Sequence, residues 1–191
     1  FPKKGVGGSE FPYVLAGMVE SWGGEVVDYP ERRHCCGFGF RNYLVQANRG
    51  YSIANSQKKL ESMAPYRPDL VVIYLCTNDF STARQPHETI FAGRYIELLK
   101  KVKANYGEDT PILCLASNVT PFSFDYIRNA CMMSGLSNLT YVALTSGIHN
   151  YEGDLGASWH PNYKGHIKVA SSVIPYISTI TGWEMEEKPY R

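Results

Sequence analysis

Apolar residues along the chain follow two spacings, one typical of amphipathic helices and one typical of buried strands. Apolar positions three or four residues apart predict helices over residues 11–19, 53–63, 88–104, 124–134 and from 163 to a disruption at Pro175. Short runs rich in apolar and β-branched residues predict strands over residues 25–29, 70–75, 111–116 and 141–144. Because strands and helices alternate, the expected fold class is α/β with a parallel sheet.

The run Leu70–Leu75 is the most apolar of the predicted strands. An uninterrupted apolar run is typical of a central parallel strand that is covered on both faces. In such sheets the ligand crevice lies beyond the carboxyl ends of the strands, so the polar residues that follow each strand are the first candidates for chemistry. The chain has no internal repeat or linker. We therefore expect one domain over residues 1–191, in which residues 1–67 fit the pattern more loosely.

Composition narrows the class of protein without naming a function. The 191 residues are 44% hydrophobic and 19% charged, which suits one compact domain with a sizeable core. The net charge is +1 and no basic stripe is present, so neither nucleic acid nor a membrane surface is expected as a partner. No run approaches the roughly 20 apolar residues of a membrane span, and the start at Phe1 is that expected of a processed or excised chain.

The cysteine, asparagine and tyrosine patterns leave the compartment open. Five cysteines cannot all pair within the chain, and Cys76 and Cys114 lie in apolar runs, where a free thiol packs as a small core hydrophobe. Sequons for N-glycosylation begin at Asn118 and Asn138 and matter only in a secreted eukaryotic protein. The 14 tyrosines suit a surface that handles sugars, or they simply bury area. A secreted or extracellular location is slightly favoured.

Two segments carry residue types suited to catalysis. Asn78 follows the strand 70–75, where its side-chain N–H groups can face the crevice as an oxyanion hole requires. The alternative is that Thr-Asn-Asp at 77–79 is an ordinary turn and helix cap. His160 directly precedes Pro161, which keeps it out of helical geometry, on a loop at the entrance of the last helix. Such a loop suits a general base, although a lone loop histidine is usually just solvated.

Both segments resemble conserved blocks of the SGNH hydrolases. Residues 71–81 (Val-Val-Ile-Tyr-Leu-Cys-Thr-Asn-Asp-Phe-Ser) resemble the third block, normally Gly-x-Asn-Asp after an apolar strand. Residues 159–166 (Trp-His-Pro-Asn-Tyr-Lys-Gly-His) resemble the fifth block, normally Asp-x-x-His-Pro. Together with Gly-Phe-Gly-Phe-Arg-Asn-Tyr at 37–43, they most resemble the second carbohydrate-esterase family, whose members remove acetyl groups from polysaccharides.

The resemblance implies a three-layer flavodoxin-like sheet that lacks or alters its first strand, and a serine esterase that works by acyl transfer without a metal or other cofactor. His160 would take the proton from the serine hydroxyl. Asn78 would donate to the oxyanion, with a backbone N–H of Gly37 or Gly39 as the second donor. The implied substrate is an acetyl ester of a small molecule or a polysaccharide. Two further residues would shape the site without reacting: Asp79 and Trp159.

The chain departs from the family pattern at three places. Cys76 stands at the glycine of Gly-x-Asn-Asp. The aspartate that would orient the base is missing, so either Asp154, the nearest carboxylate, or a backbone carbonyl would take that role. The nucleophile block Gly-Asp-Ser is represented only by a Gly-Gly-Ser triplet that ends at Ser9. Ser9 is either the nucleophile or a linker or N-cap serine before Glu10.

A rival resemblance indicates iron–sulfur chemistry. His34-Cys35-Cys36-Gly37 resembles the Cys-Cys-Gly motif of heterodisulfide-reductase-type subunits, and the likeness extends over residues 11–76. Cys76 would take the first place of that family's Cys-x-x-Cys, but Asp79 stands at the second. A thiolate cluster needs about four cysteine ligands, more than this segment supplies. A third hypothesis is an SGNH-like scaffold that binds carbohydrate without cleaving it.

Overall fold

The computed structural model describes residues 58, 61–62, 64–80, 85–117, 120–144, 153–156 and 160–185, with the side chain of Asn78 left out. The chain forms two compact units, Phe1–Arg67 and Pro68–Arg191. Nearly all described residues belong to the second unit, and the fold below is that of the second unit. In the first unit, the described residues Lys58, Glu61 and Ser62 are helical, within the helix predicted over 53–63. The helix predicted over 11–19 and the strand predicted over 25–29 lie outside the described residues.

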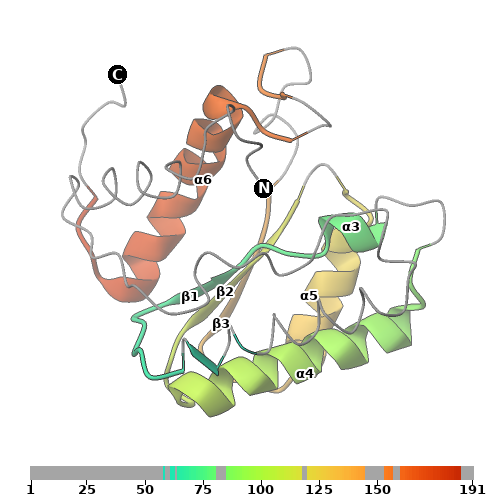
Figure 1. The fold of residues 1–191 in the computed structure, drawn as a ribbon, viewed down its shortest axis with the longest axis vertical. Helices are drawn as coiled ribbons and strands as arrows, with labels where there is room; N and C mark the ends of the chain where they lie inside the picture. Colours follow the sequence, from blue (N-terminus) through green and yellow to red (C-terminus); the bar gives the residue numbers. More distant parts are fainter. Residues whose placement is uncertain are drawn as a thin grey trace. The chain divides into compact units, whose positions relative to one another are not determined.

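The second unit is built on three parallel strands in the order β1-β2-β3 (Figure 1). The strands are β1 (Val71–Ile73), β2 (Ile112–Ala116) and β3 (Leu139–Ala143). Val71 pairs with Ile112, which in turn pairs with Leu139, so the three strands start in register. The helices that connect and follow them are α3 (Thr77–Phe80), α4 (Glu88–Tyr106), α5 (Ser123–Met133) and α6 (Tyr163–Thr181).

Helices cover both faces of this sheet, which confirms the predicted α/β class and its three layers. Figure 1 shows α4 and α5 on one side of the strands and α6 on the other. The alternation of side chains along β2 separates two cores: Ile112, Cys114 and Ala116 pack with α4 and α5, whereas Leu113 and Leu115 pack with Val173 of α6. The layered arrangement is that of a flavodoxin-like fold.

The strand with both faces covered is β2, and the prediction that residues 70–75 would be such a strand is wrong. All five residues of β2 are buried. In β1 and the residues after it, Val72 is 44% exposed and Leu75 is 55% exposed. The reason is position, because β1 lies at one end of the described sheet and only β2 lies between two strands. Apolar character alone does not distinguish the two positions.

Helix α6 continues beyond the residue that was expected to disturb it. Pro175 lies inside the helix, which ends only at Thr181, before Gly182 in the left-handed conformation. Proline removes one backbone hydrogen bond, but Ile177 and Ile180 beyond it pack against the core on this face of the sheet. The partial burial of these two residues offsets the lost bond. None of the described helices is long and apolar enough to span a membrane.

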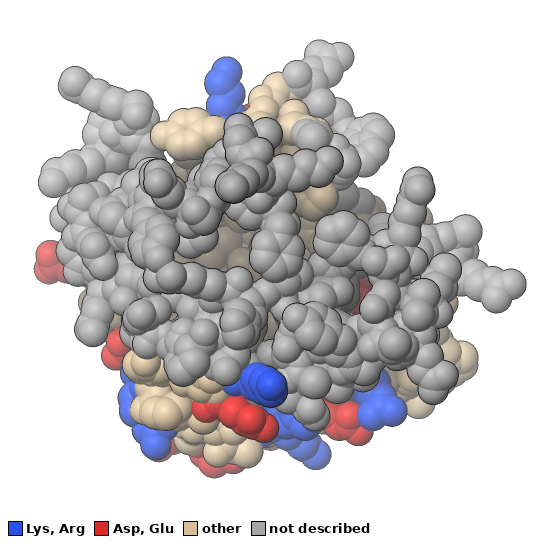
Figure 2. All heavy atoms as spheres, viewed as in Figure 1, with Lys and Arg blue, Asp and Glu red and all other residues tan. Residues whose placement is uncertain are grey.

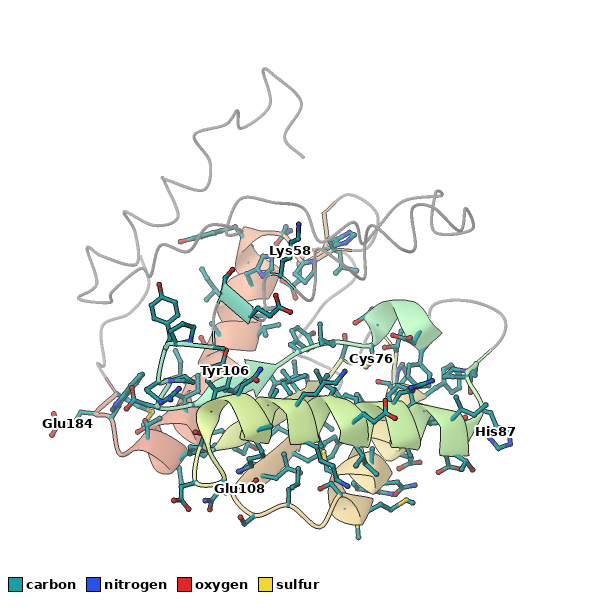
Figure 3. All side chains as sticks on the ribbon, turned by 60° about the horizontal axis from the view of Figure 1, so that its bottom comes forward. Lys58, Cys76, His87, Tyr106, Glu108 and Glu184 are labelled. Atoms are coloured by element: carbon teal, nitrogen blue, oxygen red, sulfur yellow. The ribbon has the colours of Figure 1, made fainter. Side chains whose placement is uncertain are left out.

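A buried lysine closes the turn between α4 and β2. Lys103 is 1% exposed, and its Nζ donates to the carbonyl oxygens of Glu108 at 2.6 Å and Thr110 at 2.8 Å. The Thr110 hydroxyl donates to the carbonyl of Tyr106 at 2.7 Å. Figure 3 shows Tyr106 and Glu108 at this end of α4. The ammonium group thus satisfies carbonyl groups of the turn that follows α4.

Elsewhere the described surface carries both signs of charge. Acidic and basic side chains lie next to one another over the coloured part of Figure 2. Two of these contacts are ion pairs within one helix turn, Arg94–Glu97 at 2.9 Å and Arg128–Asp125 at 2.7 Å. Both are well exposed, so they contribute little to stability.

Replacing the buried lysine should destabilise the protein. We expect Lys103→Met to lower the free energy of unfolding by about 2–3 kcal/mol, because the carbonyl groups of Glu108 and Thr110 lose charged donors while the aliphatic stem is retained. Urea denaturation followed by circular dichroism measures the change. The exposed Lys101 of the same helix provides the control, since Lys101→Met should shift stability by less than about 0.5 kcal/mol. Equal midpoints for the two variants would contradict the role given to Lys103.

Candidate active site

The candidate site lies at the carboxyl edge of the sheet, where parallel strands present their ligand crevice. Residues 74–80 follow β1 and residues 117–123 follow β2 at this edge. The segment 153–162 leads into α6. Figure 1 shows α3 and the beginning of α6 at this same end of the strands. The two segments singled out in the sequence, around Asn78 and around His160, therefore belong to one edge of one sheet.

Cys76 turns the chain between β1 and α3 in an unusual backbone conformation. Its φ is 78°, in the left-handed region that favours glycine. The Asp79 N–H donates to the Cys76 carbonyl at 3.1 Å and closes the turn. Figure 3 shows Cys76 directly before α3. A glycine, which the family resemblance predicts at this position, could adopt such a φ at no steric cost, whereas Cys76 adopts it with a side chain present.

The Cys76 thiol is not suited to act as a nucleophile. Burial is the largest of three effects that together raise the pKa of this thiol to about 12; electrostatic interactions with Asp79 and, to a smaller extent, with Cys114 act in the same direction. A thiol reacts as its thiolate, which is a very small fraction at neutral pH under these conditions. The side chain instead packs against the core next to α4 and α5.

Helix α3 carries two residues of the predicted site, Asn78 and Asp79, and the aromatic residue Phe80 anchors it to the core. Asn78 lies in its first turn, and its side chain is not described. Asp79 follows, and desolvation raises the pKa of its carboxyl group, with a partial opposing effect from a backbone hydrogen bond. Phe80 is buried, and its ring meets those of Phe91 at 5.2 Å and Tyr126 at 4.9 Å edge-on. These contacts tie the short helix to α4 and α5.

His160 lies on a loop that doubles back on itself before α6. The Gly156 N–H donates to the carbonyl of His160 at 2.7 Å, and the Asn162 N–H donates to the carbonyl of Asp154 at 2.8 Å. Leu155 and Pro161 form an antiparallel bridge between these two bonds. His160 is exposed and precedes the first residue of α6 by three positions. The prediction that it sits on a loop at the helix entrance is confirmed.

Asn162 and Gly165 lock this loop to the helix. The Asn162 Oδ1 accepts the Gly165 N–H at 3.1 Å, as an N-cap residue does, and its Nδ2 donates to the Gly153 carbonyl at 2.8 Å. Gly165 is buried against the Asp154 carbonyl oxygen, and a Cβ at this position would overlap that oxygen. Asn and Gly three residues apart after His-Pro are therefore explained by packing of the loop on the helix.

Asp154 is buried and pairs with a lysine of α6. Its side chain is 4% exposed, and its Oδ2 lies 2.6 Å from the Nζ of Lys168. The pairing neutralises a carboxylate that would otherwise be costly to bury. Asp154 and His160 thus lie on opposite sides of the doubled loop. The role of Asp154 in orienting His160 stays a prediction.

The structure does not describe every residue of the predicted site. Ser9, Gly37, Gly39 and Trp159 lie outside the described residues, as do the side chain of Asn78 and the cysteine pair at 35–36. Two residues that the sequence analysis did not single out contribute to the described part, Lys168 and Gly165. The cap spacing from Asn162 could have indicated Gly165. Nothing in the sequence indicates Lys168, because its partner is set by the path of the loop.

Metal chemistry gains no support from the described part of the chain. No group of three or more His, Cys, Asp or Glu side chains among the described residues could hold a metal ion. Cys76, Cys114 and Cys131 are free thiols. Cys114 is fully buried in the core, as expected of a cysteine that packs as a small hydrophobe.

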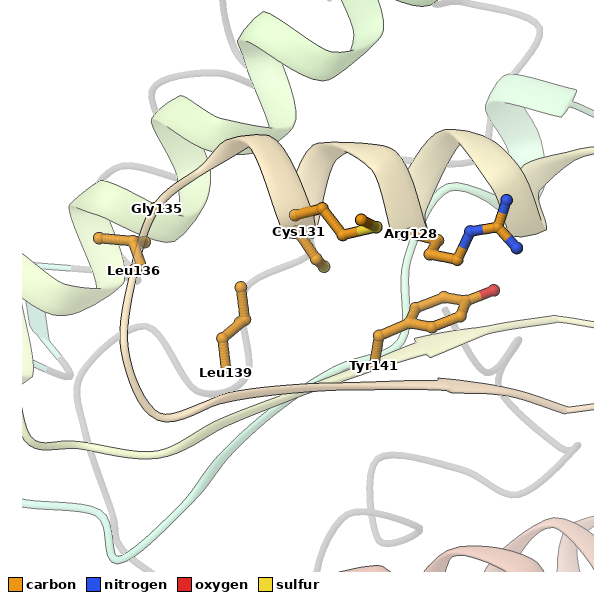
Figure 4. Close-up of a pocket in the computed structure, with 7 residues that line it drawn as sticks. Arg128, Cys131, Gly135, Leu136, Leu139 and Tyr141 are labelled. Atoms are coloured by element: carbon orange, nitrogen blue, oxygen red, sulfur yellow. The ribbon is translucent and has the colours of Figure 1, made fainter.

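A surface pocket lies away from the candidate site. It has a volume of about 250 Å³ and opens between the end of α5 and β3 (Figure 4). Gly135, Leu136 and Leu139, which line it, come before or at the start of β3, at the amino edge of the sheet. None of the predicted site residues lines this pocket.

Comparison with known proteins gives one partial similarity. The chain is 30% identical over 127 residues to cellulase/esterase CelE from Acetivibrio thermocellus. The match covers 62% of this chain and 15% of that protein, so the chain spans a small part of its relative. No protein-family model matches the chain, and no solved structure matches it significantly. The predicted likeness to a carbohydrate esterase is thus supported at the level of a distant, partial match.

The close contact at Gly165 can be tested by adding one methyl group. We expect Gly165→Ala to lower the free energy of unfolding by about 2 kcal/mol or more, because the new Cβ displaces the Asp154 carbonyl. Gly93 in α4 has nothing within 4 Å of its own Cβ position, so Gly93→Ala should stabilise the protein by about 0.5–1 kcal/mol. Thermal denaturation compares the variants. Stabilisation by both substitutions would rule out the proposed close packing.

The backbone conformation of Cys76 has its own test. Cys76→Gly and Cys76→Ala both remove the thiol, but only alanine keeps a Cβ in the left-handed region. We therefore expect the glycine variant to be more stable than the alanine variant by about 1 kcal/mol. Chemical denaturation measures the difference. An alanine variant that is at least as stable as the glycine variant would show that the turn is not under this constraint.

Proposed function

We propose that the chain is a carbohydrate esterase that removes acetyl groups by acyl transfer through a serine and His160. The observation that carries the proposal is the doubled loop before α6, which holds the backbone of His160 by a hydrogen bond and leaves its side chain exposed at the carboxyl edge of the sheet. A general base requires this kind of mount, rigid in the main chain and open to substrate. The partial similarity to a cellulase/esterase supports the same reaction class.

The proposed mechanism uses the chain's own residues and no cofactor. A serine hydroxyl, with Ser9 as the candidate, attacks the acetyl carbonyl while His160 takes its proton and later returns it to the leaving sugar oxygen. Asn78 and a backbone N–H of Gly37 or Gly39 donate to the oxyanion. Asp79 organises its loop, and Trp159 presents its backbone or ring to the substrate. The proposed substrate is an acetyl ester of a polysaccharide.

Asp154 has one of two roles in this scheme. It either contributes to orienting His160 across the doubled loop or serves only to hold the loop on α6 through Lys168. The ion pair with Lys168 favours the second role, because a carboxylate that is neutralised by a lysine polarises a histidine less. A backbone carbonyl would then orient the imidazole.

A second candidate function is a scaffold that binds acetylated carbohydrate without hydrolysis. The ion pair favours it, because a carboxylate that is neutralised by Lys168 gives His160 less support as a general base. A serine-reactive fluorophosphonate probe separates the two functions. An esterase should be labelled at one serine, identified by peptide mass spectrometry, and should release acetate from acetylated xylan. A chain that binds acetylated xylan, releases no acetate and is not labelled would be the scaffold.

The role of His160 is tested against a neighbouring histidine. We expect His160→Ala to lower kcat/KM for p-nitrophenyl acetate by roughly a thousandfold or more, since it removes the general base. Its stability should change by less than about 0.5 kcal/mol, because the side chain is exposed. His166, also exposed and one turn along α6, is the matched control, and His166→Ala should retain full activity. Equal activity of the two variants would exclude His160 as the base.

A further inference from the structure

Thr120 carries a buried hydroxyl that has no hydrogen-bond partner among the described residues. The residue is 5% exposed, and its Oγ1 is one of two such buried side-chain atoms in the described part of the chain. The other is the hydroxyl of Tyr95, which lies against the thiols of Cys114 and Cys131 in the core. Thr120 differs because it lies in the turn after β2, at the carboxyl edge of the sheet.

The main chain around Thr120 is fixed on both sides. Its N–H donates to the Ser117 carbonyl at 3.1 Å, and its own carbonyl accepts the Ser123 N–H at 2.9 Å. Ser117 and Ser123 are themselves 3% and 1% exposed. The two bonds therefore restrain the main chain of Thr120, and burial keeps its side chain out of bulk water. Such preorganisation is what a group that binds a ligand requires.

Thr120 and the strained turn at Cys76 follow neighbouring strands at the same edge of the sheet. Strands β1 and β2 are hydrogen-bonded neighbours, with Ile73 opposite Cys114. Cys76, with its left-handed backbone, follows the first strand, and Thr120 follows the second. After neighbouring strands at one edge, the chain thus has a left-handed backbone at Cys76 and, at Thr120, a buried hydroxyl that is unpaired among the described residues. Buried unsatisfied groups and strained backbone are costly, and they are typically retained at functional sites.

We propose that Thr120 is a substrate-positioning residue whose hydroxyl hydrogen-bonds to a sugar oxygen of the acetylated carbohydrate, directly or through one bridging water. The assignment rests on the proposed esterase function and adds a group that recognises the sugar rather than the acetyl ester. A hydroxyl can donate to a ring or acetal oxygen and accept from a sugar hydroxyl, which suits an oxygen-rich ligand. An aryl acetate has no such oxygen, so it should not depend on Thr120.

The experiment compares variants with and without the hydroxyl on two substrates. Thr120→Val removes the hydroxyl and keeps the shape, and Thr120→Ser restores it. Expression in a bacterial host avoids N-glycosylation at the Asn118-Val119-Thr120 sequon. KM and kcat are measured with acetylated xylo-oligosaccharides and with p-nitrophenyl acetate, and thermal unfolding is recorded for each variant. Thr110 is the matched control, since its hydroxyl already donates to the Tyr106 carbonyl at 2.7 Å.

We expect Thr120→Val to raise KM for the acetylated oligosaccharides by roughly tenfold, the effect of about one hydrogen bond. Its kinetics with p-nitrophenyl acetate should be unchanged, and its unfolding midpoint should equal or exceed that of the wild type, because no native hydrogen bond is lost. Thr120→Ser should restore KM. Thr110→Val should show the opposite pattern, a lower midpoint with unchanged kinetics on both substrates.

Three results would overturn the assignment. These are an unchanged KM for the oligosaccharides, an equal loss on both substrates, or an unfolding midpoint lowered as much as in Thr110→Val. Failure of the esterase function itself has a different signature, namely a wild-type protein that hydrolyses neither substrate. In that case calorimetric binding of the same oligosaccharides takes the place of KM, and equal affinity of wild type and Thr120→Val would overturn the role of Thr120.

Discussion

The described fold depends on the burial of β2 on both faces. A strand in this position admits only apolar side chains, and every one of its residues is buried. Its alternating side chains divide the interior into two cores, so that α4 and α5 pack on one face and α6 on the other. The turns at its two ends are then under different demands. The amino end is closed by a buried lysine that satisfies carbonyl groups. After the carboxyl end, the buried hydroxyl of Thr120 has no partner within the described part of the chain.

The loop after β1 and the loop before α6 determine where the candidate site residues lie. After β1 the chain turns through a left-handed residue into a helix of four residues, whose phenylalanine anchors it among aromatic rings. Before α6 the chain doubles back and is locked by a cap, an ion pair and a glycine without room for a side chain. The result is a histidine with a restrained main chain and an exposed ring. The proposed acyl transfer and its carbohydrate substrate draw their support from the partial similarity to a cellulase/esterase.

Periodicity predicted the elements well wherever packing and local preference agree. The helices at 88–106 and 123–133 and the strand at 112–116 were anticipated to within two residues. The exposure of Val72 and the continuation of α6 past Pro175 were not predicted. Both depend on which elements pack against the sheet in the folded protein. In the site, His160 on its loop was predictable from the proline after it. The pairing of Asp154 with Lys168 was not, because it depends on how residues 153–156 fold against α6.

The two long helices differ in how many of their residues are buried, and this affects the order in which the protein loses structure on unfolding. Helix α4 buries six residues, whereas α6, of equal length, buries only Gly165 and Val173. Regions with few buried contacts open locally at a lower free energy than the whole domain. Helix α6 is therefore the element expected to detach first, and it would carry the His160 loop with it. Loss of α6 on heating would then precede global melting, with amides of α6 exchanging before those of β2.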